Sequence, residues 1–306
     1  MPTLAVVTTF PPNRWTTYAK RMLESHIKFW PDDVTIYAYH EGKKPELEHA
    51  KVKFVNIEDA CPELLKFKQR HKDDPVANGE TNEIPGGVRR DPKAGKNDKG
   101  KGSYLWDAVR FSHKTFAVDH AIKTINTDYV LWLDADTYTF RPITTKFVTD
   151  LLPKDKLVNF LGRGETYPEC GWVCYNKRHS KIKEFMDYWT TLYTKDTIFK
   201  ELEWHDSYLF WQCVKRIAPD DGVDIGKGAG AEGHHVFINS ELGAYIDHMK
   251  GKRKVLGKSS KSDLRGGRNE DYWKNVDNYD PFGGVQFNPE EADDIVSKVA
   301  KGNQGN

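Results

Sequence analysis

The distribution of apolar residues along the chain predicts an α/β fold. Residues 4–9 (LAVVTT) are β-branched and almost continuously apolar, as in a strand buried on both faces of a sheet. A pair of prolines ends this run, and residues 16–30 then carry apolar side chains at mostly three- to four-residue steps, which is typical of an amphipathic helix. Residues 34–39 alternate, and residues 52–55 form a third apolar run. This order predicts a Rossmann-like, mixed but mainly parallel sheet flanked by helices.

The same pattern continues in the second half of the chain. Residues 106–125 carry an apolar stripe at helical spacing, and residues 130–133 form a short, fully apolar strand. Further strands are predicted at residues 157–161 and 171–175, and further helices at residues 143–152, 181–193, 204–217 and 290–300.

Two segments depart from this pattern and set the predicted domain boundaries. Residues 68–102 are rich in proline, glycine and charge, and a loop of this length inside a compact domain predicts a mobile insertion. From residue 257 to residue 306 the chain is polar and glycine-rich. We therefore predict one domain over residues 1–256, with halves 1–160 and 161–256, followed by a polar C-terminal extension.

Composition excludes several classes of protein. The 306 residues are 38% hydrophobic and 12% aromatic, which excludes wholesale disorder. The 46 basic and 45 acidic residues give a net charge of +1, which argues against a uniformly basic coat for nucleic acid. No apolar run reaches the length of a membrane-spanning helix, and the N-terminus lacks the basic region of a signal peptide. The four cysteines lack metal-type spacing, so we expect reduced thiols in a cytoplasmic protein.

The segment with the clearest chemistry is 129–142 (YVLWLDADTYTFRP). Its apolar strand runs directly into Asp134 and Asp136, and ligands of open α/β sheets bind beyond the carboxyl ends of the strands. Carboxylate oxygens at this place suit Mg²⁺ or Mn²⁺. The alternative is a solvated turn with two aspartates, but the strongly apolar strand before it favours the metal site.

A second segment, 248–254 (HMKGKRK), supplies complementary groups. The imidazole of His248 is a suitable third metal ligand, and Lys254 adds positive charge beside an anion. The alternative is a surface histidine in a basic turn.

These two segments resemble the D-x-D and H-x-x-G-x-x-K motifs of nucleotide-sugar-dependent glycosyltransferases with the A-type fold, closest to the retaining family 8. Val255 and Leu256 stand where that family has Pro-Trp. The resemblance implies that residues 1–160 bind the nucleotide sugar, with a UDP-sugar favoured, and that residues 161–256 complete the metal and acceptor sites. It also implies that Asp134 contacts the ribose or the metal, and that Asp136 and His248 complete the metal centre with it. Gly251 and Lys254 would hold the diphosphate.

Two further groups of residues are candidates for donor binding. Asp107, Arg110 and Lys114 share one helix face, where they would meet the diphosphate or the donor sugar; the alternative is a solvated charged stripe. Residues Thr8, Thr9 and Phe10 end the first strand, where a base and ribose would lie; the alternative is simple strand termination.

Two carboxylates are candidates for catalysis. Glu169 precedes a predicted strand beside a glycine and is expected to contact the donor sugar or the acceptor, unless it is an ordinary loop residue. Asp206 opens a predicted helix, where it is either an N-cap or the carboxylate that orients the acceptor hydroxyl or acts as general base.

The expected function is therefore transfer of a hexosyl or pentosyl group to a hydroxyl acceptor. The acceptor is left open as a glycan, a protein, a small molecule or, for a viral chain in the host cytoplasm, a hydroxymethylated DNA base. One alternative is a nucleotidyltransferase acting on a sugar phosphate, although residues 11–14 (PPNR) are not the glycine-rich basic loop that such enzymes usually carry. The other is a non-catalytic carbohydrate- or nucleic-acid-binding module, which leaves the D-x-D motif unexplained.

Although the net charge of the chain is close to zero, its charged residues are unevenly distributed along the sequence. Residues 86–102 contain six basic and two acidic side chains (+4), and residues 248–268 contain eight basic and one acidic (+7). Residues 269–306 contain three basic and eight acidic side chains (−5). Each block is either a solvated loop or part of the frame of a cleft that receives anions, namely the donor diphosphate and a polyanionic acceptor.

Overall fold

The fold is a single seven-stranded sheet between two layers of helices. A computed structural model describes residues 2–81, 104–164, 166–230, 235–251 and 253–274. The sheet has the order β3-β2-β1-β4-β7-β6-β8, and a separate two-stranded sheet joins β5 and β9. The strands are β1 Leu4–Phe10, β2 Thr35–His40, β3 Val52–Asn56, β4 Tyr129–Leu133, β5 Thr137–Thr139, β6 Val158–Arg163, β7 Thr166–Asn176, β8 Gly222–Asp224 and β9 Ile246–His248.

Six of the seven strands of the large sheet run in one direction. Only β7 runs the opposite way, and it pairs antiparallel with both β4 and β6. The predicted α/β class with a mixed, mainly parallel sheet is therefore confirmed. β1 and β4 lie at the centre of the sheet and are buried almost throughout, which explains why their sequences are continuously apolar rather than alternating.

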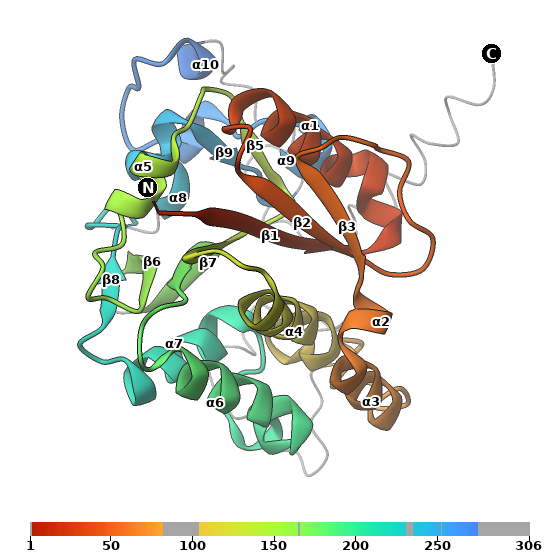
Figure 1. Ribbon diagram of the computed structural model, residues 1–306. Helices are drawn as coiled ribbons and strands as arrows, with labels where there is room; N and C mark the ends of the chain where they lie inside the picture. The colour runs from red at the N-terminus through yellow and green to blue at the C-terminus, as the bar shows by residue number, and fades with distance from the viewer. Residues whose placement is uncertain (1, 82–103, 165, 231–234, 252, 275–306) are drawn as a thin grey trace, which may run out of the picture.

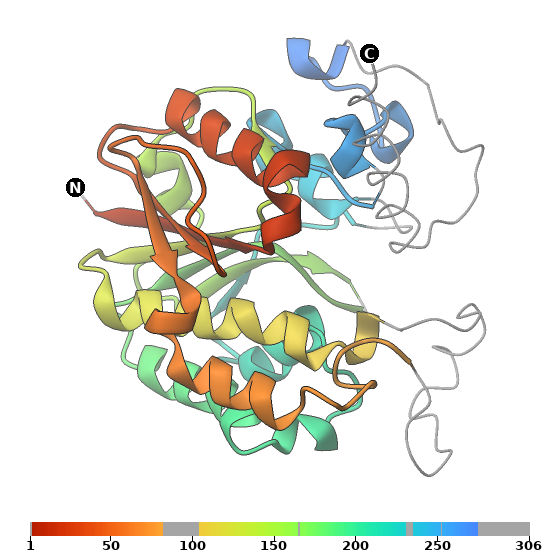
Figure 2. The same cartoon turned by 90° about the vertical axis from the view of Figure 1, so that its right-hand side faces the viewer.

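Helices cover both faces of the sheet (Figures 1 and 2). In Figure 1, α3, α4, α6 and α7 lie below the sheet, and α1, α5 and α8 lie above it. Each layer closes its own apolar core, with Val7, Val130 and Val173 facing one and Leu131 and Trp172 the other. The helices are α1 Lys20–Phe29, α2 Ile57–Ala60, α3 Pro62–Arg70, α4 Ala108–Thr124, α5 Thr145–Asp150, α6 Ile182–Thr194, α7 Asp206–Ile217, α8 Val236–Asn239, α9 Arg253–Leu256 and α10 Asp271–Lys274.

The structure differs from the predicted elements in several respects. β7 begins at Thr166, so Glu169 lies within this strand and does not precede it. The predicted insertion begins too early, because α3 extends to Arg70 and both Val76 and Ala77 are buried in the core. The predicted helix over residues 16–30 is a π-helical turn, Trp15–Ala19, followed by α1. The strands β5, β8 and β9 have three residues each, too few for an alternating pattern to reveal them. The predicted helix over 290–300 and residues 82–102 of the predicted insertion lie outside the described residues.

Residues 257–274, which follow the predicted boundary at position 256, pack against the domain. Figure 2 shows them on the same side of the sheet as α1. Trp273 is buried, and its indole N–H donates to the carbonyl of Gly243 at 2.6 Å. Tyr272 stacks on Phe140 with ring centroids 4.0 Å apart. Among the described residues, none of the helices combines the length and apolarity needed to cross a membrane.

Candidate metal centre

Asp134 and Asp136 lie on the tight turn that connects β4 to β5. β4 ends at Leu133, and the N–H of Asp134 donates to the carbonyl of Gly171 on β7 at 2.9 Å. The backbone N–H and the hydroxyl of Thr137 both donate to the carbonyl of Asp134, at 3.2 and 2.8 Å, which closes the turn. The turn thus begins at the carboxyl end of a central strand, where sequence reasoning placed it.

His248 reaches this turn because β9 pairs with β5. The two strands are antiparallel, with Thr137 opposite His248. The N–H of Met249 donates to the carbonyl of Asp136 at 3.0 Å and extends the pairing by one residue. The small second sheet therefore joins the two motifs that the sequence separates.

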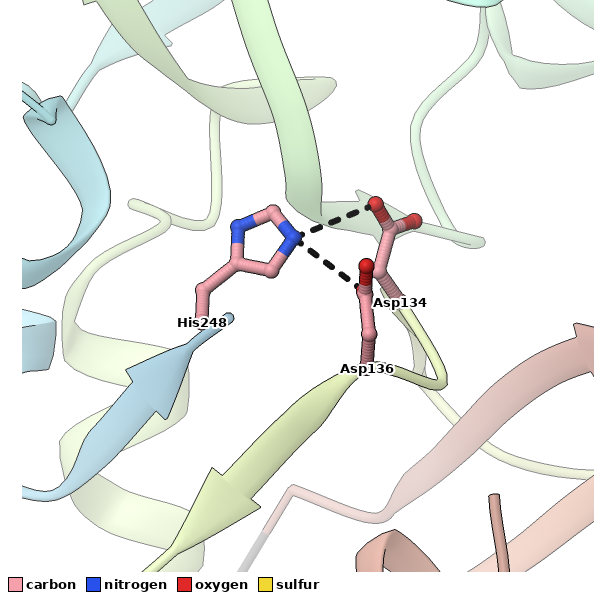
Figure 3. A group of neighbouring side chains, drawn as sticks. All are labelled: Asp134, Asp136 and His248. Carbon is pink, nitrogen blue, oxygen red and sulfur yellow. Dashed lines mark ion pairs between the residues drawn. The ribbon is translucent and has the colours of Figure 1, made fainter. Parts of the chain in front are cut away.

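The three side chains converge on one point (Figure 3). The imidazole Nε2 of His248 lies 3.2 Å from Oδ1 of Asp136 and 3.6 Å from Oδ2 of Asp134. One ligand atom from each residue lies within 4.8 Å of the others, so together they could hold a metal ion. Asp136 and His248 are buried and Asp134 is partly exposed, which leaves one side of the group open. Two carboxylates and one imidazole fit Mn²⁺ or Mg²⁺.

Two cationic neighbours keep the carboxylate of Asp136 ionised. Burial opposes ionisation of Asp136, but Lys254 and His248 outweigh it and hold the pKa of that carboxyl far below its usual range. Burial lowers the pKa of His248, but Glu169 and Asp136 outweigh it and raise it to about 10. Burial raises the pKa of Asp134. The imidazolium and the Lys254 ammonium thus lie where a divalent cation would neutralise the same carboxylates.

Lys114 connects this group to Asp206. It lies on α4 and is buried, and its Nζ donates to Oδ2 of Asp206 at 2.7 Å and to the carbonyl of Cys170 at 2.5 Å. The same nitrogen lies 3.8 Å from Oδ1 of Asp134 and 4.8 Å from the centre of the Trp132 ring. Burial disfavours the ammonium, but Asp206 and Asp134 outweigh it and raise its pKa. Lys114 is therefore a charged link between two carboxylates.

Asp206 is the first residue of α7, and His205 takes the N-cap position. The carboxylate of Asp206 is buried, and the ammonium of Lys114 is its closest ion-pair partner. Burial opposes its ionisation, but Lys114 and His205 lower its pKa. Asp206 is thus an ionised, paired carboxylate, which is a poor proton acceptor.

Glu169 lies on the other side of the His248 ring from the two aspartates. Its Oε1 is 3.4 Å from Nδ1 of His248 and 3.8 Å from Nζ of Lys250. Burial opposes its ionisation, but Lys250 and His248 hold its pKa well below the usual range. The structure thus brings both predicted catalytic carboxylates close to the metal ligands, one through Lys114 and one through His248.

The remaining predicted residues lie around this centre. Nζ of Lys254 lies 2.7 Å from Oδ2 of Asp136. Gly251 has a φ of +55°, in the left-handed region that favours glycine. Asp107 is the N-cap of α4 and accepts from the N–H of Arg110 at 3.0 Å, while the Arg110 side chain is exposed. The structure does not bring Asp107 or Arg110 into contact with the three metal ligands.

The three predicted residues at the end of β1 have separate surroundings. Thr8 is buried and its hydroxyl makes no hydrogen bond within the described residues. The hydroxyl of Thr9 donates to the carbonyl of Tyr39 at 3.0 Å. Phe10 packs on Trp15 with ring centroids 5.8 Å apart. All four cysteines are buried and free, as predicted: Cys61, Cys170, Cys174 and Cys213.

Sequence reasoning missed two residues that surround the ligands. The Tyr18 ring lies 5.5 Å from the Lys254 ammonium, and burial together with Asp136 raises the pKa of its hydroxyl. Nε2 of His235 lies 2.7 Å from the carbonyl of His248. Tyr18 is one of many aromatic residues and carries no motif. The His234–His235 pair is visible in the sequence, but no spacing rule connects it to His248.

Comparison with known proteins reveals structural likeness to solved glycosyltransferases. No protein-family model and no curated protein matches the sequence. The apo form of the glycosyltransferase GlyE from Streptococcus pneumoniae TIGR4 aligns with 12% identity and a TM-score of 0.40, over 74% of this chain and 46% of GlyE, so the chain spans about half the length of GlyE. At these values the likeness assigns no activity to this chain.

Two further solved structures give similar values. A glycosyltransferase involved in the glycosylation of the major capsid of PBCV-1 aligns with 17% identity and a TM-score of 0.39, over 84% of this chain and 98% of its own. Mouse xyloside xylosyltransferase 1 aligns with 11% identity and a TM-score of 0.42, over 72% of this chain and 84% of its own.

Proposed function

We propose that this protein is a metal-dependent glycosyltransferase that moves a sugar from a nucleotide sugar, with a UDP-sugar favoured, to a hydroxyl acceptor. The observation that carries this proposal is the convergence of Asp134, Asp136 and His248 at the carboxyl end of β4, with Lys254 beside them. In this proposal residues 1–256 form the catalytic domain.

Different residues of the chain would bind the metal and neutralise the donor diphosphate. Asp134, Asp136 and His248 would hold Mn²⁺ or Mg²⁺, which supplies Lewis-acid neutralisation of the leaving diphosphate. Lys254 would add a positive charge beside Asp136, and its backbone N–H donates to the carbonyl of Gly251 at 3.2 Å. These are groups that stabilise negative charge growing on a leaving phosphate oxygen.

An aromatic cluster at the carboxyl ends of β1, β2 and β3 supports a site for the nucleoside. Trp15 lies 5.8 Å from Phe10 and 6.1 Å from Phe54, and His40 lies 6.0 Å from Phe54, between ring centroids. Trp15 and Phe54 are partly exposed and offer ring surface to a base. The unpaired hydroxyl of Thr8 lies on the same strand end.

The state of Asp206 supports a retaining reaction. An inverting transferase needs a carboxylate that accepts the proton of the acceptor hydroxyl. Asp206 is ion-paired with Lys114 and its pKa is lowered, so it does not meet this need. In the proposed reaction the leaving phosphate takes the proton of the acceptor hydroxyl. Asp206, held by its ion pair with Lys114, orients that hydroxyl.

The test is a donor screen. The purified chain is incubated with a panel of UDP- and GDP-sugars and Mn²⁺, with and without glycan, protein and hydroxymethylated-DNA acceptors, and released nucleoside diphosphate is measured. We expect Mn²⁺-dependent release that falls on the order of 100-fold or more in Asp136→Asn, because the metal stabilises the leaving group. Asp150→Asn is the matched control, since Asp150 is exposed on α5 and pairs only with Lys146 within the described residues.

Three outcomes would overturn the proposal. Pyrophosphate release from a nucleoside triphosphate and a sugar phosphate would identify a nucleotidyltransferase. Donor binding with no turnover under any condition would identify a binding module. Full activity in Asp136→Asn would remove the metal centre from the mechanism. For an active enzyme, the anomeric configuration of the product, read by NMR, separates retention from inversion.

A further inference from the structure

Glu169 is a buried carboxylate beside the imidazole of His248. The residue is 5% exposed, and its Oε1 accepts the N–H of Gly171 at 2.8 Å. The same oxygen lies 3.4 Å from Nδ1 of His248, on the far side of the imidazole from the atom that faces Asp134 and Asp136. Glu169 is therefore placed to act on the metal ligands through His248.

Gly171 is the residue that allows this approach. A side-chain Cβ at Gly171 would lie 2.6 Å from Cε1 of His248 and 2.7 Å from Oε1 of Glu169, and real Cβ atoms do not come so close. The imidazole and the carboxylate thus occupy the space directly above the β7 backbone. His235 contacts the backbone of His248, because its Nε2 lies 2.7 Å from the carbonyl oxygen of His248.

In the Glu169–His248 pair, two buried polar atoms make no hydrogen bond within the described residues. They are Nδ1 of His248 and Oε2 of Glu169. Buried polar atoms are normally paired, so this arrangement has a function or a missing partner. A metal ion on Nε2 requires a neutral imidazole whose proton is on Nδ1, and such a proton is usually held by a carboxylate or a carbonyl.

We infer that Glu169 is a positioning residue that accepts the Nδ1 proton of His248 and thereby turns Nε2 toward the metal, with Gly171 making room for the pair. This inference rests on the metal centre of the proposed function. It replaces the expectation that Glu169 contacts the sugar or the acceptor, because the carboxylate is directed at the far side of the ring and is held there by Gly171 and Lys250.

The test measures Mn²⁺ binding without any donor, by calorimetry and by the electron-spin-echo signal of the imidazole nitrogen bound to Mn²⁺. Glu169→Ala removes the acceptor, and we expect the affinity for Mn²⁺ to fall about 10- to 100-fold. Glu169→Gln keeps an acceptor oxygen without the charge and should restore most of this loss. Gly171→Ala should weaken binding and the nitrogen signal, because the added Cβ displaces the imidazole.

The matched control is Glu203→Ala. Glu203 is also buried and its Oε2 lies 2.6 Å from Nε2 of His205, so the pair has the same chemistry but lies outside the metal centre. Its loss should lower stability and leave Mn²⁺ binding unchanged. Unchanged Mn²⁺ affinity in folded Glu169→Ala would overturn the inference alone. A wild-type protein that binds Mn²⁺ but turns over no donor would overturn the proposed function alone.

Discussion

Nζ of Lys254 lies 2.7 Å from Oδ2 of Asp136, while Oδ1 of the same carboxylate faces His248. In the proposed metal centre, a metal ion and an ammonium group would therefore compete for one carboxylate when nothing else is bound. The donor diphosphate would change this balance, because it brings negative charge that the ammonium can pair with. We therefore expect Lys254 to weaken binding of the metal alone and to strengthen binding of the metal together with the diphosphate.

This relationship predicts opposite effects in Lys254→Met. Removing the ammonium should tighten Mn²⁺ binding to the free protein by roughly threefold to tenfold, and should weaken binding of UDP in the presence of Mn²⁺ by about tenfold, which is about 1.4 kcal/mol. Both constants come from calorimetry. Lys261→Met is the control, since Lys261 is exposed. Two constants that move in the same direction would contradict the competition.

The buried pair of Lys114 and Asp206 predicts a large effect on stability. Lys114→Met leaves Asp206 buried without its partner, and removing one member of such a pair costs about 3–5 kcal/mol. The free energy of unfolding, measured in urea, should fall by that amount. The double variant Lys114→Met/Asp206→Asn should recover part of it, because no unpaired buried charge remains at Asp206. A double variant that is less stable than the single one would show that the pair is not the cause.

The residues of the candidate metal centre could be picked out from the sequence because each is marked locally. A fully apolar strand precedes Asp134, and His248 has a glycine and a lysine at fixed spacing after it. The arrangement around them could not be predicted, because it depends on long-range pairing. Glu169 lies beside His248 only because β7 runs against the other strands, and β9 is too short to show a pattern.

The charged face of α4 could be predicted only in part from the sequence. Helical spacing does relate Asp107, Arg110 and Lys114, but their surroundings differ. Asp107 caps the N-terminus of α4, Arg110 is exposed, and Lys114 is buried and contacts Cys170 and Asp206. Periodicity identifies the residues that share a face, and it does not identify which of them a neighbouring strand will cover.

A third prediction concerns Asp247, the neighbour of His248 on β9. Asp247 is fully buried and accepts from the N–H of Ser259 at 2.8 Å, from its hydroxyl at 2.6 Å and from the hydroxyl of Tyr272 at 2.7 Å. Ser259 and Tyr272 thus hold the strand that carries His248, a candidate metal ligand. Tyr272→Phe removes one of these donors and should lower the free energy of unfolding by about 1–3 kcal/mol.

The same substitution should weaken Mn²⁺ binding, because the position of β9 sets the position of His248. Calorimetry with Mn²⁺ checks this, next to urea unfolding of the same sample. Tyr188→Phe is the control, since Tyr188 lies on α6 away from β9. An unchanged Mn²⁺ affinity in Tyr272→Phe would show that β9 keeps its place without this bond.

A final prediction concerns acid stability and the half-buried Glu41. His113 on α4 donates to its Oε1 at 2.9 Å, and Lys68 on α3 pairs with it. The hydrogen bond from His113 lowers the pKa of Glu41 to about 2, against the opposing effect of burial and with the help of Lys68. Unfolding frees the carboxyl to titrate near its usual value of about 4.3. Between these values the unfolded chain binds more protons than the folded chain, so the stabilisation is complete above about pH 4.3 and is lost as the pH falls toward 2.

Glu41→Gln should therefore lower the free energy of unfolding near pH 6 and flatten its decline between pH 4.3 and pH 3. The expected loss is about 1 kcal/mol or less, because solvent screens a half-exposed pair. Urea unfolding at a series of pH values measures it. Glu63→Gln is the matched control, since Glu63 pairs with Lys66 on the exposed face of α3 and carries no comparable burial. A Glu41→Gln curve that declines in parallel with the wild type would mean that the carboxyl titrates alike in both states, and that His113 and Lys68 contribute no pH-dependent stability through it.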